Sequence, residues 1–144
     1  MAEFVLDNSV AMRWLLPSAK PSDQKYAEAV LKAFNEVDAL IPSLWHLEAI
    51  NVLLMAERRA EIDAGEVEGF ISQLENLPLH VDRLTAQQAF SRTISLARIY
   101  KLSSYDATYL ELAIREGLPL ATLDKDLRKA AKKAKVDVYL VAKT

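Results

Sequence analysis

Four carboxylates, Asp7, Glu48, Asp106 and Asp124, stand at positions where a packed domain has little use for a charge. Asp7 and Asp124 directly follow short apolar runs that are typical of strands, and Glu48 and Asp106 lie in helical patterns. Buried carboxylates need a compensating partner, and no lysine or arginine recurs beside all four in the sequence. If the four side chains converge, a divalent cation is the natural partner, and the predicted chemistry is metal-dependent phosphodiester cleavage.

The residue types also narrow the choice of metal. The chain has no cysteine, which excludes disulfides, thiolate zinc sites and cysteine nucleophiles. Its two histidines, His46 and His80, are far apart in the sequence, and we assign neither a role. A set of carboxylate oxygens favours Mg²⁺ or Mn²⁺ over zinc. Two carboxylates about 5 Å apart repel each other by roughly 3 kcal/mol at an effective dielectric of 20, so four of them predict a site that needs a cation.

Each acid also has a purely structural explanation. Asp7 would form an Asx turn that leads into a helix, and Asp124 would be the N-cap of the helix that follows it. Asp106 would gain from the helix dipole in a first turn, although it shares a mostly apolar face with Tyr109. Glu48 would lie partly exposed at the rim of the sheet. These explanations account for the acids one at a time but not for the set.

Glu48 gives the sharpest case because its helix is otherwise apolar. From Leu47 to Ala56 only Glu48 and Asn51 are polar, and we expect Asn51, about one turn on, to orient Glu48 through a hydrogen bond. A helix that is apolar on all sides is covered either by another helix of its own chain or by a partner. The second reading predicts a homodimer with the apolar surplus of Leu44–Ala56 at its interface.

Length and composition predict one globular domain over residues 1–144, with 51% hydrophobic and 26% charged residues. No apolar run approaches the roughly 18 residues of a membrane span, and the N-terminus lacks the pattern of a signal peptide. We therefore expect a cytoplasmic protein with no membrane partner. A net charge of −2 argues mildly against nucleic-acid binding, so such binding would have to come from a local concentration of positive charge.

Short apolar runs alternate with helical patterns, which predicts an α/β domain: a parallel sheet between two helical layers, hence three layers in all. Ligands of such sheets gather outside the carboxyl ends of the strands, so Asp7 and Asp124 are expected to share that edge. The five predicted strands are Glu3–Leu6, Ala39–Ile41, Leu79–Val81, Leu120–Leu123 and Val136–Val141. The predicted helices are Val10–Leu16, Ser22–Asn35, Leu44–Arg59, Ala64–Leu77, Thr85–Lys101, Ser104–Glu116 and Lys125–Lys135.

Positive charge concentrates in the last predicted helix, which begins beside Asp124. It would hold phosphates near the acids, or it would only complement the helix dipole and solvate the surface. The predicted substrate contacts are Lys125, Arg128 and Lys129, with Arg13 as a lesser candidate.

Four segments resemble the PIN-domain ribonucleases, most closely the VapC-type toxins of toxin–antitoxin pairs. They are VLDNSVA at residues 5–11, EAINVL at 48–53, YDATYLELA at 105–113 and LATLDKDL at 120–127, and they occur in the family's order. The resemblance implies a five-stranded parallel sheet of order 3-2-1-4-5 and an endoribonuclease that uses Mg²⁺ or Mn²⁺. It also implies a homodimer and a cognate antitoxin that blocks the acidic site, often with a basic side chain.

The same resemblance assigns roles to individual residues. The family's acidic quartet falls on Asp7, Glu48, Asp106 and Asp124, and its supporting polar residues fall on Ser9, Asn51 and Thr122. Asp126 is either a fifth acid of the site or only a first-turn residue of the last helix.

Other functions fit the sequence less well. A phosphoacceptor signalling domain would use Asp7 with Asp82, Thr122 and Lys143, but it leaves Glu48 and the other helical acid unexplained. A haloacid-dehalogenase-like phosphatase needs a second aspartate where Ser9 stands. A non-enzymatic binding module and an RNA-processing PIN nuclease without an antitoxin are the remaining alternatives.

Overall fold

The computed structural model describes residues 2–142 of the chain, so Lys143, which the phosphoacceptor alternative requires, lies outside the described residues. The strands are β1 (Ala2–Leu6), β2 (Asp38–Ile41), β3 (Leu79–Val81) and β4 (Leu120–Ala121). The helices are α1 (Asn8–Ala11), η1 (Met12–Trp14), α2 (Pro21–Ala33), α3 (Trp45–Arg58), α4 (Ala64–Glu75), α5 (Thr85–Gln88), η2 (Ala89–Thr93), α6 (Ile94–Tyr100), α7 (Ser104–Glu116) and α8 (Lys125–Lys133).

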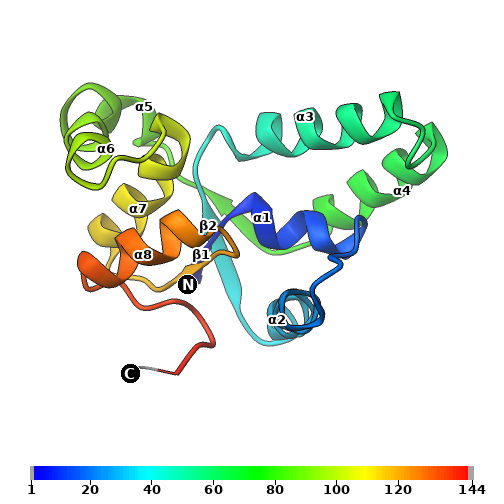
Figure 1. Cartoon of the computed structure of the whole chain (residues 1–144), viewed down its shortest axis with the longest axis horizontal. Coiled ribbons are helices and arrows are strands. Elements are labelled where there is room, and N and C mark those ends of the chain that lie inside the picture. The colour runs from blue at the N-terminus through cyan, green and yellow to red at the C-terminus, as the bar shows by residue number, and fades with distance from the viewer. Residues whose placement is uncertain (1, 143–144) are drawn as a thin grey trace.

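The strands form a four-stranded parallel sheet in the order β3-β2-β1-β4. Val5 of β1 lies beside Leu40 of β2 on one side and Leu120 of β4 on the other. In Figure 1, α1 to α4 lie on one side of the strands and α5 to α8 on the other. The predicted α/β architecture and the switch of chain direction between β1 and β4 are therefore confirmed.

The predicted fifth strand, Val136–Val141, was wrong. Val138 makes a single parallel bridge to Leu120, and no further ladder forms among the described residues. Leu140 adopts a positive φ of 62°, which turns the chain away from the sheet. Of the apolar side chains that suggested a strand, Val136 and Tyr139 pack against the core, and the ring of Tyr139 stacks on Phe4 at 4.1 Å between centroids. Leu140 and Val141 are exposed.

The predicted helix Thr85–Lys101 is helical to Tyr100, but its middle is wound as the π-helix η2, a form that occurs mostly in short pieces. The next helix, α7, begins at the N-cap Ser103 and stops at Gly117, whose positive φ of 65° is readily adopted by glycine. Its central residues, Ala107–Ala113, are buried, and the helix contacts β1. This packing fixes the first turn of α7 near the end of β1.

The apolar helix α3 is covered on one side only. Ala49 and Leu53 are buried, whereas Leu47 is 72% exposed and Ile50 is 42% exposed. In Figure 1, α3 and α4 form a hairpin that projects from the body of the domain. The apolar surplus predicted for α3 is thus not buried by the described part of its own chain. Among the described residues, no helix is both long and apolar enough to span a bilayer.

Candidate metal centre

The four acids come from four segments far apart in the sequence. Asp7 follows β1, and its N–H donates to the carbonyl of Ala121 in β4. Glu48 and Asp106 lie in the first turns of α3 and α7, and Asp124 is the N-cap of α8. The carboxyl ends of β1 and β4 and the start of three helices therefore supply the site.

Asp7 is held by hydroxyl groups. Its Oδ2 accepts hydrogen bonds from Ser9 Oγ at 2.6 Å and from Thr122 Oγ1 at 2.8 Å, and the residue is only 6% exposed. Although Asp7 is the N-cap of α1, its side chain makes no capping hydrogen bond. The helix-initiating turn proposed as its structural explanation is therefore not what this carboxylate does.

Ser9 and Thr122 also fix the loop that carries Asp124. Ser9 Oγ accepts from the N–H of Leu123 at 2.9 Å, and Thr122 Oγ1 accepts from the N–H of Asp124 at 3.1 Å. Asp124 Oδ1 accepts from the N–H of Leu127 at 2.8 Å, so its predicted capping role is real. Capping occupies one oxygen of Asp124 and leaves the other for a ligand.

Glu48 is held by residues other than the one expected. Its Oε1 accepts from the hydroxyl of Tyr109 at 2.5 Å and from Asn8 Nδ2 at 3.4 Å. Asn51 is exposed, and no hydrogen bond joins it to Glu48 within residues 2–142, so the orienting role predicted for Asn51 was wrong. Three residues along a helix leave two side chains about 60° apart, and here that angle turns Asn51 to solvent. The signal for Tyr109 was its spacing of three from Asp106.

Burial raises the pKa of Asp7 to about 6. The hydrogen bonds from Ser9 and Thr122 oppose this rise, and the charges of Glu48 and Asp124 add to it. A carboxylate in an apolar setting pays for its lost hydration unless an opposite charge replaces it. Asp7 thus lies in a place where its ionised form is destabilised.

The neighbouring acids behave in the same way. Burial, helped by the charges of Asp124 and Asp7, raises the pKa of Asp106 to about 6. Burial also raises the pKa of Glu48 against the hydrogen bonds that it accepts, and the charge of Asp106 adds to that rise. The exposed Asp126 acts on Asp106 from the first turn of α8. The acids are therefore close enough to repel one another.

Among the described residues, no basic side chain is paired with these acids. Within residues 2–142, none of the ion pairs involves a member of the quartet. Asp82, the second acid of the phosphoacceptor alternative, is paired with Arg115 at 2.8 Å. That alternative therefore lacks its pair of strand-end acids.

The donor set fits a hard divalent cation in chemistry and charge. It consists of carboxylate oxygens, it is partly buried, and it lacks a cationic partner among the described residues. In the same part of the chain, no three histidine, aspartate or glutamate side chains are drawn together tightly enough to hold an ion as they stand. Binding of an ion would have to draw the carboxylates closer together.

The predicted substrate contacts differ in availability. Lys125 and Lys129 are exposed on α8, and Arg13 is half-buried. Arg128 instead lies over the ring of Tyr26 at 4.8 Å, and its Nε donates to the carbonyl of Thr122 at 2.7 Å. A phosphate contact by Arg128 was predicted, but its guanidinium is used to tie α2 and α8 to the end of β4.

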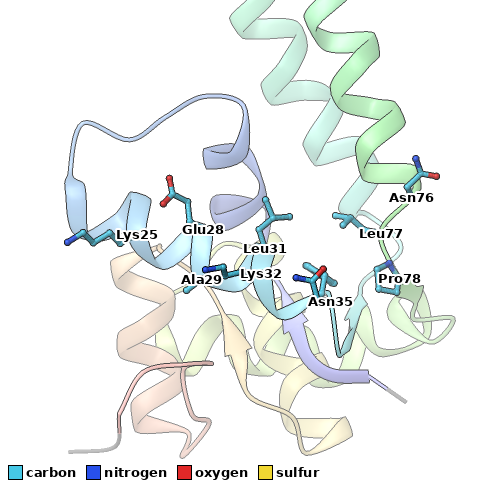
Figure 2. Close-up of a pocket in the computed structure, with 10 residues that line it drawn as sticks. Lys25, Glu28, Ala29, Leu31, Lys32, Asn35, Asn76, Leu77 and Pro78 are labelled. Atoms are coloured by element: carbon cyan, nitrogen blue, oxygen red, sulfur yellow. The ribbon is translucent and has the colours of Figure 1, made fainter.

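The acidic set lies outside the five main surface hollows of residues 2–142. One hollow of about 760 Å³ lies between α2 and the turn that joins α4 to β3 (Figure 2). Its walls include Lys25, Leu31, Lys32 and Leu77, and no member of the quartet. The candidate centre is therefore identified by charge and strand ends rather than by a cavity.

Comparisons with known proteins agree with the fold. A family model described as PIN domain matches residues 4–133. The crystal structure of PAE2754 from Pyrobaculum aerophilum is similar, with a TM-score of 0.65 and 21% identity over 90% of this chain and 86% of that one. At that identity the likeness shows the fold alone. Among curated protein sequences, none matches this chain at a significant level.

Proposed function

We propose that this chain, which belongs to the PIN-domain family, is a metal-dependent endoribonuclease and the toxin of a VapBC-type toxin–antitoxin pair. PIN domains are typically nucleases, and the family is generally metal-dependent. The observation that carries the proposal is the buried carboxylate of Asp7, which has further acids near it and no ion pair with a basic side chain among residues 2–142. Such a group is most simply explained as a ligand for Mg²⁺ or Mn²⁺.

The four acids Asp7, Glu48, Asp106 and Asp124 would hold the ion. When bound, a divalent cation supplies Lewis acidity, which lowers the pKa of water and offsets the charge of a phosphate. Glu48 or Asp106 would orient the attacking water through a carboxylate oxygen.

Ser9 and Thr122 would keep Asp7 in one orientation through the hydroxyl bonds described above. Lys125 and Lys129, exposed near the start of α8, would contact RNA phosphates from outside the acidic set. The expected substrate is single-stranded or looped RNA, and we expect the protein to act in the cytoplasm.

The homodimer is proposed from the uncovered side of α3. Leu47, Ile50, Leu54 and Met55 are exposed there, and together they form an apolar stripe next to Glu48. Light scattering at micromolar concentration should give a mass of about 32 kDa, twice the 16.1 kDa of one chain. A sharp monomer would overturn the dimer and leave the nuclease proposal intact.

Cleavage assays test the nuclease proposal. Purified protein should cut RNA with Mg²⁺ or Mn²⁺ and stop in EDTA, and Asp7→Asn or Glu48→Gln should lower the rate at least about 100-fold. Glu36→Gln, an exposed acid in the turn after α2, is the matched control and should retain the wild-type rate. Full activity in chelator with no metal carried over would overturn the mechanism.

Growth assays separate a toxin from an RNA-processing nuclease. Induction of the wild type should arrest growth, and Asp7→Asn and Glu48→Gln should lose RNA cleavage and toxicity together. An antitoxin that offers an arginine to the acids would pair with them, so a basic antitoxin peptide should bind both variants more weakly by about 1–3 kcal/mol. Cleavage in vitro without any effect on growth would favour the RNA-processing nuclease.

A further inference from the structure

Glu48 is anchored by a closed set of hydrogen bonds from three different elements. Tyr109 of α7 donates its hydroxyl to Glu48 Oε1 at 2.5 Å, and Asn8 of α1 approaches the same oxygen at 3.4 Å. Asn8 Nδ2 also reaches the Tyr109 hydroxyl oxygen at 3.3 Å and the carbonyl of Trp45 at 3.0 Å. We call the three side chains Asn8, Glu48 and Tyr109 the Glu48 triad.

The hydroxyl of Tyr109 both donates and accepts a hydrogen bond within the triad. Tyr109 is fully buried, so its O–H group needs an acceptor, and Glu48 Oε1 accepts it at 2.5 Å. The hydroxyl oxygen in turn accepts from Asn8, which fixes the direction of the O–H bond.

The two donors of the triad select one oxygen of Glu48. Both act on Oε1, whereas Oε2 accepts no hydrogen bond from any residue in the described range 2–142. A buried tyrosine hydroxyl needs an acceptor, but a backbone carbonyl is enough for that purpose. Tyr26 satisfies its hydroxyl in this way on the carbonyl of Tyr139 at 2.6 Å. Burial alone therefore does not explain why Tyr109 is aimed at an acid of the site.

We infer that Tyr109, supported by Asn8, is a positioning residue that occupies Oε1 of Glu48 and leaves Oε2 as the oxygen through which Glu48 acts at the metal centre. This inference rests on the proposed metal-dependent function. It assigns Tyr109 and Asn8, rather than Asn51, the task of orienting the helix acid. The benefit is that Glu48 presents a single oxygen in a fixed direction before a cation binds.

Calorimetric titration with Mn²⁺ alone tests the inference without relying on cleavage. Tyr109→Phe removes only the hydroxyl and should weaken Mn²⁺ binding roughly tenfold, the lower part of the range for partners that orient ligands. In a Glu48→Gln background the same change should have little further effect, because the hydroxyl acts through Glu48. A loss that persists undiminished in that background, or no loss in the single variant, would overturn the positioning role.

Tyr26→Phe is the matched control, since it also removes one tyrosine hydroxyl that donates a hydrogen bond, here from a partly buried side chain. Any effect of Tyr26→Phe on Mn²⁺ binding should be the same with or without Glu48→Gln. If Tyr109→Phe melts below the assay temperature, Asn8→Ala is measured instead. It should weaken Mn²⁺ binding by a smaller factor, and this loss should vanish in the Glu48→Gln background. An unchanged Mn²⁺ affinity of Asn8→Ala would overturn the positioning role. A wild type that binds no Mn²⁺, or Glu48→Gln binding as tightly as wild type, would instead overturn the proposed function and the inference with it.

Discussion

The two ends of α7 carry acids in opposite electrostatic situations. At the N-terminal end, Asp106 lies near other carboxylates, and no basic side chain within residues 2–142 forms an ion pair with it. At the C-terminal end, Arg115 joins two buried acids, Glu111 at 1% exposure and Asp82 at 8%. Its guanidinium forms two hydrogen bonds to Asp82, at 3.0 and 2.8 Å, and two to Glu111, both at 2.9 Å.

The pKa values express this difference. Burial would raise the pKa of Asp82, but the hydrogen bonds from Arg115 and Thr85 outweigh it and leave that pKa lowered. Burial raises the pKa of Asp106 to about 6, and the charges of the neighbouring acids add to the rise against one hydrogen bond with Ser103. Near the C-terminal end of α7, Arg115 forms an ion-pair network with Glu111 and Asp82. Near the N-terminal end, Asp106 belongs to a group of acids with no basic partner among residues 2–142, which we call the unfinished cluster: Asp7, Glu48, Asp106 and Asp124. The first stabilises the fold, and the second is available to a ligand.

The largest expected effect is the loss of the network. Arg115→Ala should lower the free energy of unfolding by about 3–5 kcal/mol, because it leaves two buried carboxylates without their partner. Urea denaturation in EDTA measures it. Asp7→Asn, which removes a charge from the unfinished cluster, should leave stability unchanged or raise it. A larger loss from Asp7→Asn than from Arg115→Ala would reverse our assignment of the two clusters.

Mg²⁺ should stabilise the folded protein only by binding to the unfinished cluster. With Mg²⁺ at 100 times its Kd, the wild type should gain about 2.7 kcal/mol, which corresponds to a rise in Tm of roughly 5–10 °C for a domain of this size. Thermal melts should show the full rise in Glu111→Gln and a blunted rise in Asp7→Asn. An equal rise in Asp7→Asn would place the ion elsewhere.

The contributions of Asp7 and Asp82 to the free energy of unfolding should change with pH in opposite directions. Because the pKa of Asp7 is raised from 3.8 to about 6, the metal-free folded state binds more protons than the unfolded state between those values, and this contribution lowers stability as pH rises from 4 to 6. The unfolding free energy of Asp7→Asn minus that of wild type should therefore grow by about 2 kcal/mol over this range and level off above pH 7.

Asp82 has a lowered pKa, so its stabilising contribution is complete at neutral pH and is lost as pH falls below 4. The stability difference between wild type and Asp82→Asn should accordingly shrink in acid. Denaturation series from pH 3 to 8 measure both differences. A difference between Asp7→Asn and wild type that does not change with pH would show that Asp7 has an ordinary pKa.

The smallest expected effect concerns the outer member of the network. Arg92 approaches Glu111 at 3.8 Å, but its side chain is 56% exposed. Exposed ion pairs contribute about 0–1 kcal/mol, so Arg92→Ala should change the unfolding free energy by less than about 1 kcal/mol in the same urea assay. A loss equal to that of Arg115→Ala would mean that Arg92 is a full partner of the buried acids.

Much of the fold was predictable from local patterns. Alternating apolar strands and amphipathic helices predict a parallel sheet, and the strand-end position of Asp7 and Asp124 predicts that both lie at one edge of it. Apolar residues near the C-terminus, by contrast, predicted a fifth strand that does not form. Pattern alone does not distinguish side chains that cover a core, such as Tyr139 on Phe4, from those of a paired strand.

The sequence by itself therefore determined the acidic set and the elements that carry it, because residue type and period act over a few positions. Only the tertiary structure decided which groups hold those acids. Tyr109 reaches Glu48 across 61 residues of sequence, and Arg115 reaches Asp82 across 33. Such pairs depend on how α7 packs against the sheet, since a side chain finds its partner through the position of its whole element rather than through its neighbours in the chain.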